Sequence, residues 1–433
     1  MARRKILDPI HSFIRYNNGE KLVLASWPMQ RLHYIHQNSL AYLVYPGATH
    51  SRFEHSLGVM ELAGMAFDTI ASEENRHERC RDVFPTDSQL DYWRQVLRLA
   101  ALSHDMGHLP FSHAAEEEIL PPGTNHETYT MEIIRSDEMR AIWKQVDDRI
   151  DPEHIVKLAV GEKELDVPFT PWEKILSEII TGDVFGVDRM DYLLRDSHYT
   201  GVPSGRFDHY RLIDMLRVLP KSRTSDEITL GIDEGGLRSA EDLLLSRYFM
   251  FKQVYYHDVC RVYSFHLTKF LKLWKAENPG LQNIIYRMTD NEVLAELLKA
   301  SRDAGHPGHE PAKNIIRREH YKLLFQPTPE TSQRGLTGNV IFNLAVEAFG
   351  SDAVFHDQGD KSGKIPCFTV LTRTNGLESS EKLSSIFSTI PPVEAEYVFI
   401  RREECQEARR WLREILDNSA EGVHPKLGNN LNR

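Results

Sequence analysis

Apolar residues recur at helical spacing along most of the first 280 positions. In the segment 51–71 they follow a period near 3.6, and Ser51 and Glu54 have the spacing of a capping box. This pattern predicts a helix that begins at Ser51. A second helical pattern covers 90–105 and ends before a loop that contains glycine and proline.

The middle of the chain changes its pattern twice. Residues 172–201 predict two short helices with a break near 182–186, where two glycines interrupt the helical spacing. The hexapeptide 228–233 is typical of a strand, and the glycine-rich 234–236 predicts a turn after it. Residues 239–275 contain neither proline nor glycine, so we expect one continuous helix there.

After residue 280, strand-like and helix-like segments alternate. They occupy 364–373, 381–390, 395–400 and 403–416. We therefore expect a mainly α fold in which a helical core is followed by a small α/β piece. The expected boundaries are a helical core over 1–280, an α+β region over 281–417 and a flexible tail over 418–433.

The composition narrows the class of protein. Of the 433 residues, 41% are hydrophobic and 27% charged, which is typical of a globular protein with a sizeable core. The net charge of −11 argues against a general nucleic-acid coat protein but allows a local basic pocket.

The cysteines and the N-terminus bear on the cellular compartment. The 4 cysteines form no CxxC pair, and we find no signal-peptide pattern. No apolar run is long enough for a membrane span. We expect a cytoplasmic protein with reduced thiols.

The decapeptide HDMGHLPFSH at 104–113 concentrates groups that can bind metals or transfer protons. His55 and Asp188 lie far from it in sequence, but each falls on a predicted helix. Imidazole nitrogens and carboxylate oxygens together suit a transition-metal ion in a catalytic site. The pair His126 and Glu127 follows soon after and could act as a general acid. Each residue alone is more often structural, so a chance cluster on a polar loop is the alternative.

Four segments in this order resemble the HD superfamily, and within it the branch of deoxynucleoside triphosphate (dNTP) triphosphohydrolases. They are PGATHSRFEHSLGV (46–59), LSHDMGHLPFSH (102–113), GVDRMDYLLRDSHYTG (186–201) and LLLSRYFMFKQVYYHDVCR (243–261). The resemblance runs from about residue 7 to residue 275 and is much less distinct in the C-terminal third. It implies that the helical core is a catalytic HD domain.

The resemblance also implies a metal centre and a catalytic group. The metal ligands would be His55, His104, Asp105 and Asp188, with the identity of the divalent ion (Mn, Fe, Mg, Ni, Co or Zn) left open. The catalytic residues that it implies are His126, His113, Glu116 and, through the metal, Asp105. Glutamate at position 116 departs from the aspartate that is usual in the family.

The substrate contacts that the resemblance implies are Gln37, Arg52, Arg189, Tyr192, Asp196, Arg247 and Tyr255. Arg52 precedes His55 by three residues on the same helical face, so it could reach a phosphate beside the metal, although a salt bridge at the helix start is the simpler interpretation. Tyr255 would pack where a 2′-hydroxyl would sit, which favours deoxyribonucleotides. The alternative for Arg247 and Tyr255 is a purely structural role, in which the aromatic residues of this helix are buried in the core and the arginine forms a salt bridge.

Two departures from the family bear on regulation and phosphate binding. Ala25 and His33 replace the aspartate and arginine of relatives with a guanine-specific regulatory site, so we expect no activation by guanine nucleotides. Phe251 and Asp258 stand where histidine and lysine are common, which weakens the expected hold on phosphate.

The expected activity is metal-dependent hydrolysis of a dNTP at the α-phosphate to deoxynucleoside and inorganic triphosphate. We expect a homo-oligomer, with a regulatory nucleotide at a subunit interface as a further partner. Two alternatives remain open: another HD-type nucleotide phosphatase or phosphodiesterase, and a nucleotide-sensing regulatory protein without turnover.

Overall fold

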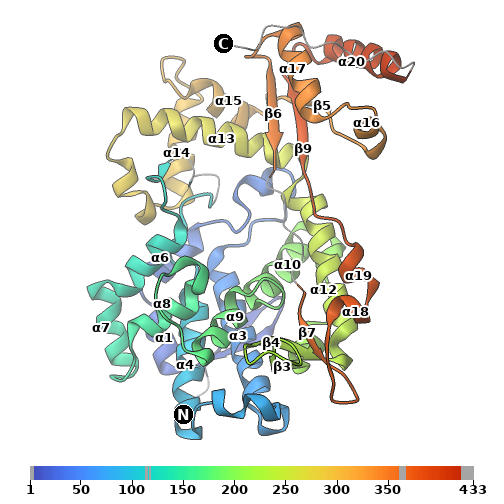
Figure 1. Ribbon diagram of the computed structural model, residues 1–433. Coiled ribbons are helices and arrows are strands. Elements are labelled where there is room, and N and C mark those ends of the chain that lie inside the picture. The colour runs from blue at the N-terminus through green and yellow to red at the C-terminus, as the bar shows by residue number, and fades with distance from the viewer. Residues whose placement is uncertain (1–3, 113–115, 117–118, 360–366, 421–433) are drawn as a thin grey trace.

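The structure of the protein is a computed structural model that describes residues 4–112, 116, 119–359 and 367–420. Its centre is a bundle of helices around α3 (Arg52–Ala71), which packs against α4 (Asp87–Ser103), α9 (Pro171–Thr181) and α10 (Val187–Thr200) (Figure 1). Buried residues occur on all sides of α3, as expected for a helix enclosed by others. The predicted mainly α fold is confirmed.

Other helices complete the core and the C-terminal lobe. In chain order they are α1 (Asn18–Leu24), α2 (Trp27–Arg31), α6 (His126–Arg135), α7 (Asp137–Val146), α8 (Pro152–Val160), α11 (His209–Asp214), α14 (Asp290–Ala300), α15 (His309–Arg317), α16 (Pro329–Gln333), α17 (Gly338–Phe349), α18 (Ser380–Leu383), α19 (Ser385–Thr389) and α20 (Cys405–Ala420). No helix of the described residues is long and apolar enough to cross a membrane.

The helix starts show which local signals decided the fold. Thr170 and Glu173 form a capping box at α9, which Pro171 reinforces at its first position. The capping box predicted at α3 is wrong: Ser51 is the N-cap, but its side chain makes no cap bond. Glu54 instead accepts a hydrogen bond of 2.8 Å from the Tyr199 hydroxyl. The predicted break between α9 and α10 is confirmed.

The long helix predicted over 239–275 is interrupted. Helix α12 (Leu237–Met250) continues into a wide π turn over 251–255, and α13 (Asp258–Glu277) begins anew after it. The His257 ring accepts from the Val259 N–H, which caps the new helix. The carbonyl of Tyr256 accepts a hydrogen bond of 2.8 Å from the hydroxyl of Tyr397 in a distant strand. The break therefore depends on a tertiary contact as well as on a cap.

Three small sheets lie around the helices. The first is the hairpin β1 (Arg4–Asp8) and β2 (Ser12–Tyr16). The second has the order β3 (Leu216–Pro220), β4 (Ile228–Asp233), β7 (Thr369–Leu371) and β8 (Leu377–Ser379), with β7 parallel to β4 and the other pairs antiparallel. The third, antiparallel sheet has the order β5 (Lys322–Phe325), β9 (Glu396–Ile400) and β6 (Val354–Gln358).

The C-terminal part of the chain has two locations. Strands β5, β6 and β9 form a separate lobe with α17 and α20, at the top of Figure 1. Strands β7 and β8, by contrast, extend a sheet that begins with β3 and β4 beside the helical core. The predicted alternation of strands and helices after residue 280 is confirmed, and the part of the expected tail beyond Ala420 lies outside the described residues.

Candidate metal and substrate site

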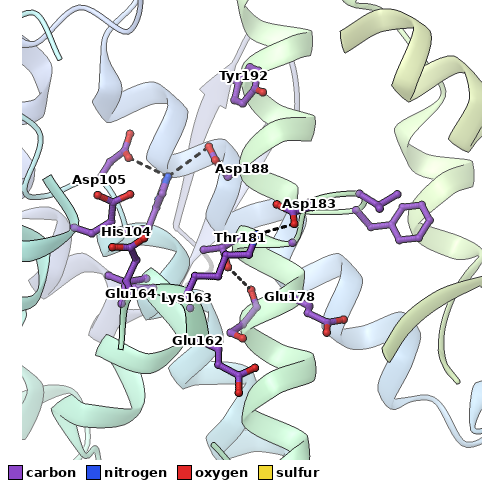
Figure 2. Close-up of a pocket in the computed structure, with 18 of the residues that line it drawn as sticks. His104, Asp105, Glu162, Lys163, Glu164, Glu178, Thr181, Asp183, Asp188 and Tyr192 are labelled. Atoms are coloured by element: carbon purple, nitrogen blue, oxygen red, sulfur yellow. Dashed lines mark hydrogen bonds and ion pairs between the residues drawn. The ribbon is translucent and has the colours of Figure 1, made fainter. Parts of the chain in front are cut away.

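Three elements bring two imidazoles and two carboxylates together. His55 lies in the first turn of α3, His104 and Asp105 directly follow α4, and Asp188 lies in the first turn of α10. Asp188 Oδ1 is 3.0 Å from His55 Nε2 and 3.7 Å from His104 Nε2. Asp105 Oδ1 is 3.3 Å from His104 Nε2, and its Oδ2 is 3.7 Å from His55 Nε2. Figure 2 shows His104 between the two carboxylates.

The backbone and a neighbouring carboxylate orient both imidazoles. His55 Nδ1 is 2.8 Å from Asp191 Oδ2, and His104 Nδ1 is 2.8 Å from the carbonyl of Ala101. Both Nε2 atoms therefore point to the centre of the cluster, and that of His104 is buried without a hydrogen-bond partner among the described residues. Two imidazole nitrogens and two carboxylates around one point are a donor set that fits a divalent cation.

The electrostatics of the cluster also favour a cation. Burial alone would lower the pKa of His55, but hydrogen bonds and charge from Asp188, Asp191 and Asp105 raise it to about 10. Burial would raise the pKa of Asp188, yet its contacts with His104 and His55 lower it. In the absence of a metal, a proton on His55 offsets part of the negative charge of these carboxylates. A divalent ion would replace that proton, because metal ligands must be deprotonated.

A second group of titratable side chains lies next to the metal cluster. His126, the first residue of α6, is 3.1 Å from Glu116 through Nδ1 and 3.2 Å from Glu127 through Nε2. Its ring stacks on that of His108, with 3.8 Å between centroids. Burial would lower the pKa of His126, but the hydrogen bond and charge of Glu116 raise it. His113 lies outside the described residues.

Gly107 allows α6 to approach the HD loop. A Cβ atom at this position would lie 2.2 Å from the carbonyl of His126 and 2.3 Å from the backbone nitrogen of Thr130. The hydroxyl of Thr130 also accepts from the Gly107 N–H and donates to the carbonyl of His104. The segment with two metal ligands is thus fixed directly to the helix that carries His126.

Arg52 joins the metal cluster to the cavity. Its Nη1 donates to Asp105 Oδ2 at 2.6 Å and its Nε to Ser112 Oγ at 2.9 Å. Ser112 and Phe111 both have φ near +57°, a left-handed conformation that is uncommon for residues other than glycine. The salt bridge considered from the sequence is therefore present, but its acid is a candidate metal ligand.

The proposed sugar contacts lie in the same cavity as the metal cluster. Tyr255 donates a hydrogen bond of 2.7 Å to Asp196 Oδ2, and His50 Nε2 is 2.7 Å from the other carboxylate oxygen. Gln37 also lines the cavity, and its Oε1 is buried without a hydrogen-bond partner in the part of the chain that the structure describes. Tyr192 lies on α10 one turn beyond Asp188 (Figure 2).

Arg189 and Arg247 both lie close to Tyr192. Burial and the charge of Arg189 lower the pKa of Arg247, whose guanidinium lies 5.0 Å from the centre of the Phe251 ring. Arg189 donates to the carbonyls of Gly182 and Asp183. Neither arginine forms an ion pair with a described residue, and neither is among the residues that line the cavity. The structure thus places both arginines beside Tyr192 but outside the wall of the cavity.

The cavity has a volume of about 930 Å³, which is in the range of small-molecule sites. Gln37, Tyr255 and the metal cluster line it, and so does the loop at 161–164 after α8. Figure 2 shows Glu162, Lys163 and Glu164 of this loop. The loop and the neighbouring end of α9 are charged, with Lys163 paired to Asp183 at 2.6 Å.

Sequence reasoning missed several residues that support the site. Asp191 holds His55, and His50 holds Asp196. The one available signal for Asp191 was its spacing of three from Asp188, which puts both carboxylates on one face of α10. Arg195, on the same helix, is fully buried and paired with Asp191 and Asp8.

Comparisons with known proteins identify two regions. Residues 52–195 match the HD domain, and 207–330 match the HD associated region. The chain is 35% identical to the uncharacterized protein YwfO of Bacillus subtilis over 61% of this chain and 54% of that protein. It is 28% identical to the human deoxynucleoside triphosphate triphosphohydrolase SAMHD1 over 76% of this chain and 55% of that protein. The chain thus spans about half the length of these two relatives.

Two solved structures share the fold. A hypothetical protein from Aquifex aeolicus has a TM-score of 0.78 at 33% identity, covering 95% of this chain and 100% of that chain. A phosphohydrolase from Bacteroides thetaiotaomicron has a TM-score of 0.69 at 23% identity, covering 93% of this chain and 100% of that chain.

The metal cluster generates a first prediction. Asp188→Asn removes one charged ligand while keeping the side chain's size, so we expect Mn²⁺ affinity to fall by at least about tenfold. Asp183→Asn is the control, because Asp183 lines the same cavity but pairs with Lys163. Titration of the metal-free proteins with Mn²⁺, with free ion read by electron paramagnetic resonance, measures both. Equal affinities of the two variants would contradict the assignment.

Proposed function

Because the chain belongs to the HD-domain phosphohydrolases, we propose that it hydrolyses deoxynucleoside triphosphates at the α-phosphate. The products are a deoxynucleoside and inorganic triphosphate. The observation that carries this proposal is that the metal cluster and the Tyr255–Asp196 pair line the same cavity. The similarity to SAMHD1, a deoxynucleoside triphosphate triphosphohydrolase, supports the substrate class.

The sugar end of the cavity suits a deoxyribose. The Asp196 carboxylate accepts from Tyr255 and stands within hydrogen-bond distance of His50, and each oxygen has a further lone pair for a sugar hydroxyl. The unpartnered Gln37 Oε1 provides another acceptor. Tyr255 closes the space beside Asp196, so a 2′-hydroxyl would be buried against its ring. A buried hydroxyl without a partner costs roughly 1–3 kcal/mol, which disfavours ribonucleotides.

The phosphates would meet positive charge at the metal cluster, where Arg52 holds its guanidinium. Arg189 and Arg247 would add positive charge from outside the cavity wall, beside Tyr192. A divalent ion held by His55, His104, Asp105 and Asp188 would polarise the α-phosphate and lower the pKa of a water molecule. Arginine suits this place because its planar fork can donate two hydrogen bonds to one phosphate.

His126 is the proton donor in this proposal. Water adds to the α-phosphorus, the bond from phosphorus to the 5′-oxygen breaks, and that oxygen must gain a proton. Glu116 raises the pKa of His126, which favours the protonated ring, and Glu116 also orients that ring. The attacking water releases a proton to solvent, and His126 regains a proton from solvent, so the reaction consumes no net proton at this residue.

Product analysis tests the activity directly. The protein with Mn²⁺ is incubated with each dNTP, with all four together and with the matching ribonucleotides, and products are separated by anion exchange. We expect deoxynucleoside and intact triphosphate, with turnover reduced at least about 1,000-fold in Asp105→Asn, which loses a ligand to the metal.

Each other outcome of that experiment points to a different function. Phosphate or a nucleoside monophosphate as product would contradict the proposal and indicate an HD phosphatase or phosphodiesterase. Tight nucleotide binding without any product would indicate a sensor. Turnover that requires the mixture of nucleotides would add a regulatory site to the proposed activity.

The role of His126 predicts a pH dependence. Activity that needs protonated His126 falls as the pH rises through its pKa, which Glu116 raises. Glu116→Gln removes that charge, so we expect the alkaline limb of the kcat profile to move to lower pH. Glu162→Gln is the control, because Glu162 lines the same cavity but pairs with Lys174. An unchanged alkaline limb in Glu116→Gln would exclude this role.

The proposed exclusion of ribonucleotides predicts the effect of Tyr255→Ala. Removing the ring leaves room for a 2′-hydroxyl, so we expect the ratio of kcat/KM for dNTP over NTP to fall roughly 10- to 100-fold. Phe251→Ala serves as the neighbouring control, since that ring also lines the cavity but lacks the hydrogen bond to Asp196. A ratio that falls equally in both variants would mean that general packing, rather than Tyr255, selects the sugar.

A further inference from the structure

Asp191 is the most heavily bonded carboxylate near the metal cluster, yet it does not face the cavity. It is fully buried and accepts two hydrogen bonds of 2.9 Å from Arg195. Its Oδ1 is also 2.6 Å from His11 Nε2, and its Oδ2 is 2.8 Å from His55 Nδ1. A candidate metal ligand, His55, is therefore connected to a carboxylate that does not line the cavity.

The fold makes room for this carboxylate. At Gly58, one turn after His55 on α3, a Cβ atom would lie 1.8 Å from Asp191 Oδ1 and 2.6 Å from Arg195 Nη2. Any larger residue at this position would push Asp191 and Arg195 out of place. The close contact of α3 and α10 therefore depends on glycine at position 58, which leaves space for the Asp191–Arg195 pair.

The N-terminal hairpin completes the arrangement. Asp8 Oδ2 accepts from Arg195 Nη1 at 2.8 Å, and Asp8 Oδ1 accepts from the backbone N–H of His11 at 2.8 Å. His11 then presents its ring to Asp191. Three elements distant in sequence, the β1–β2 hairpin, α3 and α10, converge on this single side chain.

We infer that Asp191 is a positioning residue for the metal: it holds a proton on His55 Nδ1 and so directs the lone pair of Nε2 toward Asp188 and Asp105. A carboxylate that accepts from the far nitrogen of a ligating imidazole fixes the tautomer and raises the basicity of the ligand. Arg195 and His11 keep Asp191 in place. The inference rests on the metal site of the proposed function but not on the identity of the nucleotide.

Metal affinity measured without nucleotide tests this role. We expect Asp191→Asn to weaken Mn²⁺ binding by about 10- to 100-fold, the range for lost outer partners of metal ligands. Asp8→Asn is the matched control, because it also removes a carboxylate from Arg195 but makes no contact with His55. Thermal unfolding of both metal-free variants shows whether each remains folded. Since no substrate is present, the result is independent of which nucleotide the enzyme hydrolyses.

Two results would overturn the inference. One is a folded Asp191→Asn protein that binds Mn²⁺ as tightly as the unchanged protein. The other is an equal loss of affinity in Asp8→Asn, which would mean that Arg195 and packing carry the effect.

The unchanged protein provides a second measurement should Asp191→Asn fail to fold. In Zn²⁺-loaded protein with ¹⁵N-labelled histidine, we expect His55 to carry its proton on Nδ1, with its signals assigned by their loss in His55→Gln. A proton on Nε2 would overturn the inference.

Discussion

The close approach of α3 and α10 is the constraint on which the whole site depends. Gly58 allows it, since any side chain there would collide with Asp191. Asp188 and Asp191 are three residues apart on α10. At this helix separation Asp188 contacts Nε2 of the His55 ring, and Asp191 contacts Nδ1 of the same ring. One imidazole can face both carboxylates only if the helices are this close. The end of α4 then needs to add only His104 and Asp105 to complete the cluster.

The helices that carry the candidate metal ligands could be predicted from the sequence, because helix periodicity and helix ends are local features. The helices that carry His55, His104 and Asp188 follow from periodicity and breakers, and the motifs implied their roles. The supporting pairs were not predictable, because His11 and Asp191 are separated by 180 positions and His50 and Asp196 by 146. Nothing in the spacing of one chain segment selects a partner so far away.

The interruption between α12 and α13 shows a related limit. Residues 239–275 have the composition of one helix, and the turn at 251–255 has no proline or glycine. What opens the helix is tertiary: Tyr255 bonds to Asp196 on α10, and the carbonyl of Tyr256 bonds to Tyr397 on β9. Wide turns of this kind often occur at functional sites. Here the turn places Phe251 and Tyr255 on the wall of the cavity.

An acidic chain with a net charge of −11 must still attract a polyanion in the proposed reaction. The three carboxylates nearest the centre of the metal cluster do not oppose this, because each one has, or with a bound metal would have, a positive partner. Arg195 offsets Asp191, Arg52 offsets Asp105, and a divalent ion would offset Asp188. The salt bridge leaves one donor of Arg52 available for a further partner. Its Nη2 makes only a long contact of 3.5 Å with the carbonyl of Gln37. A phosphate oxygen would offer that group a better acceptor, so in the proposed reaction the salt bridge that fixes Arg52 would also prepare it to bind the substrate.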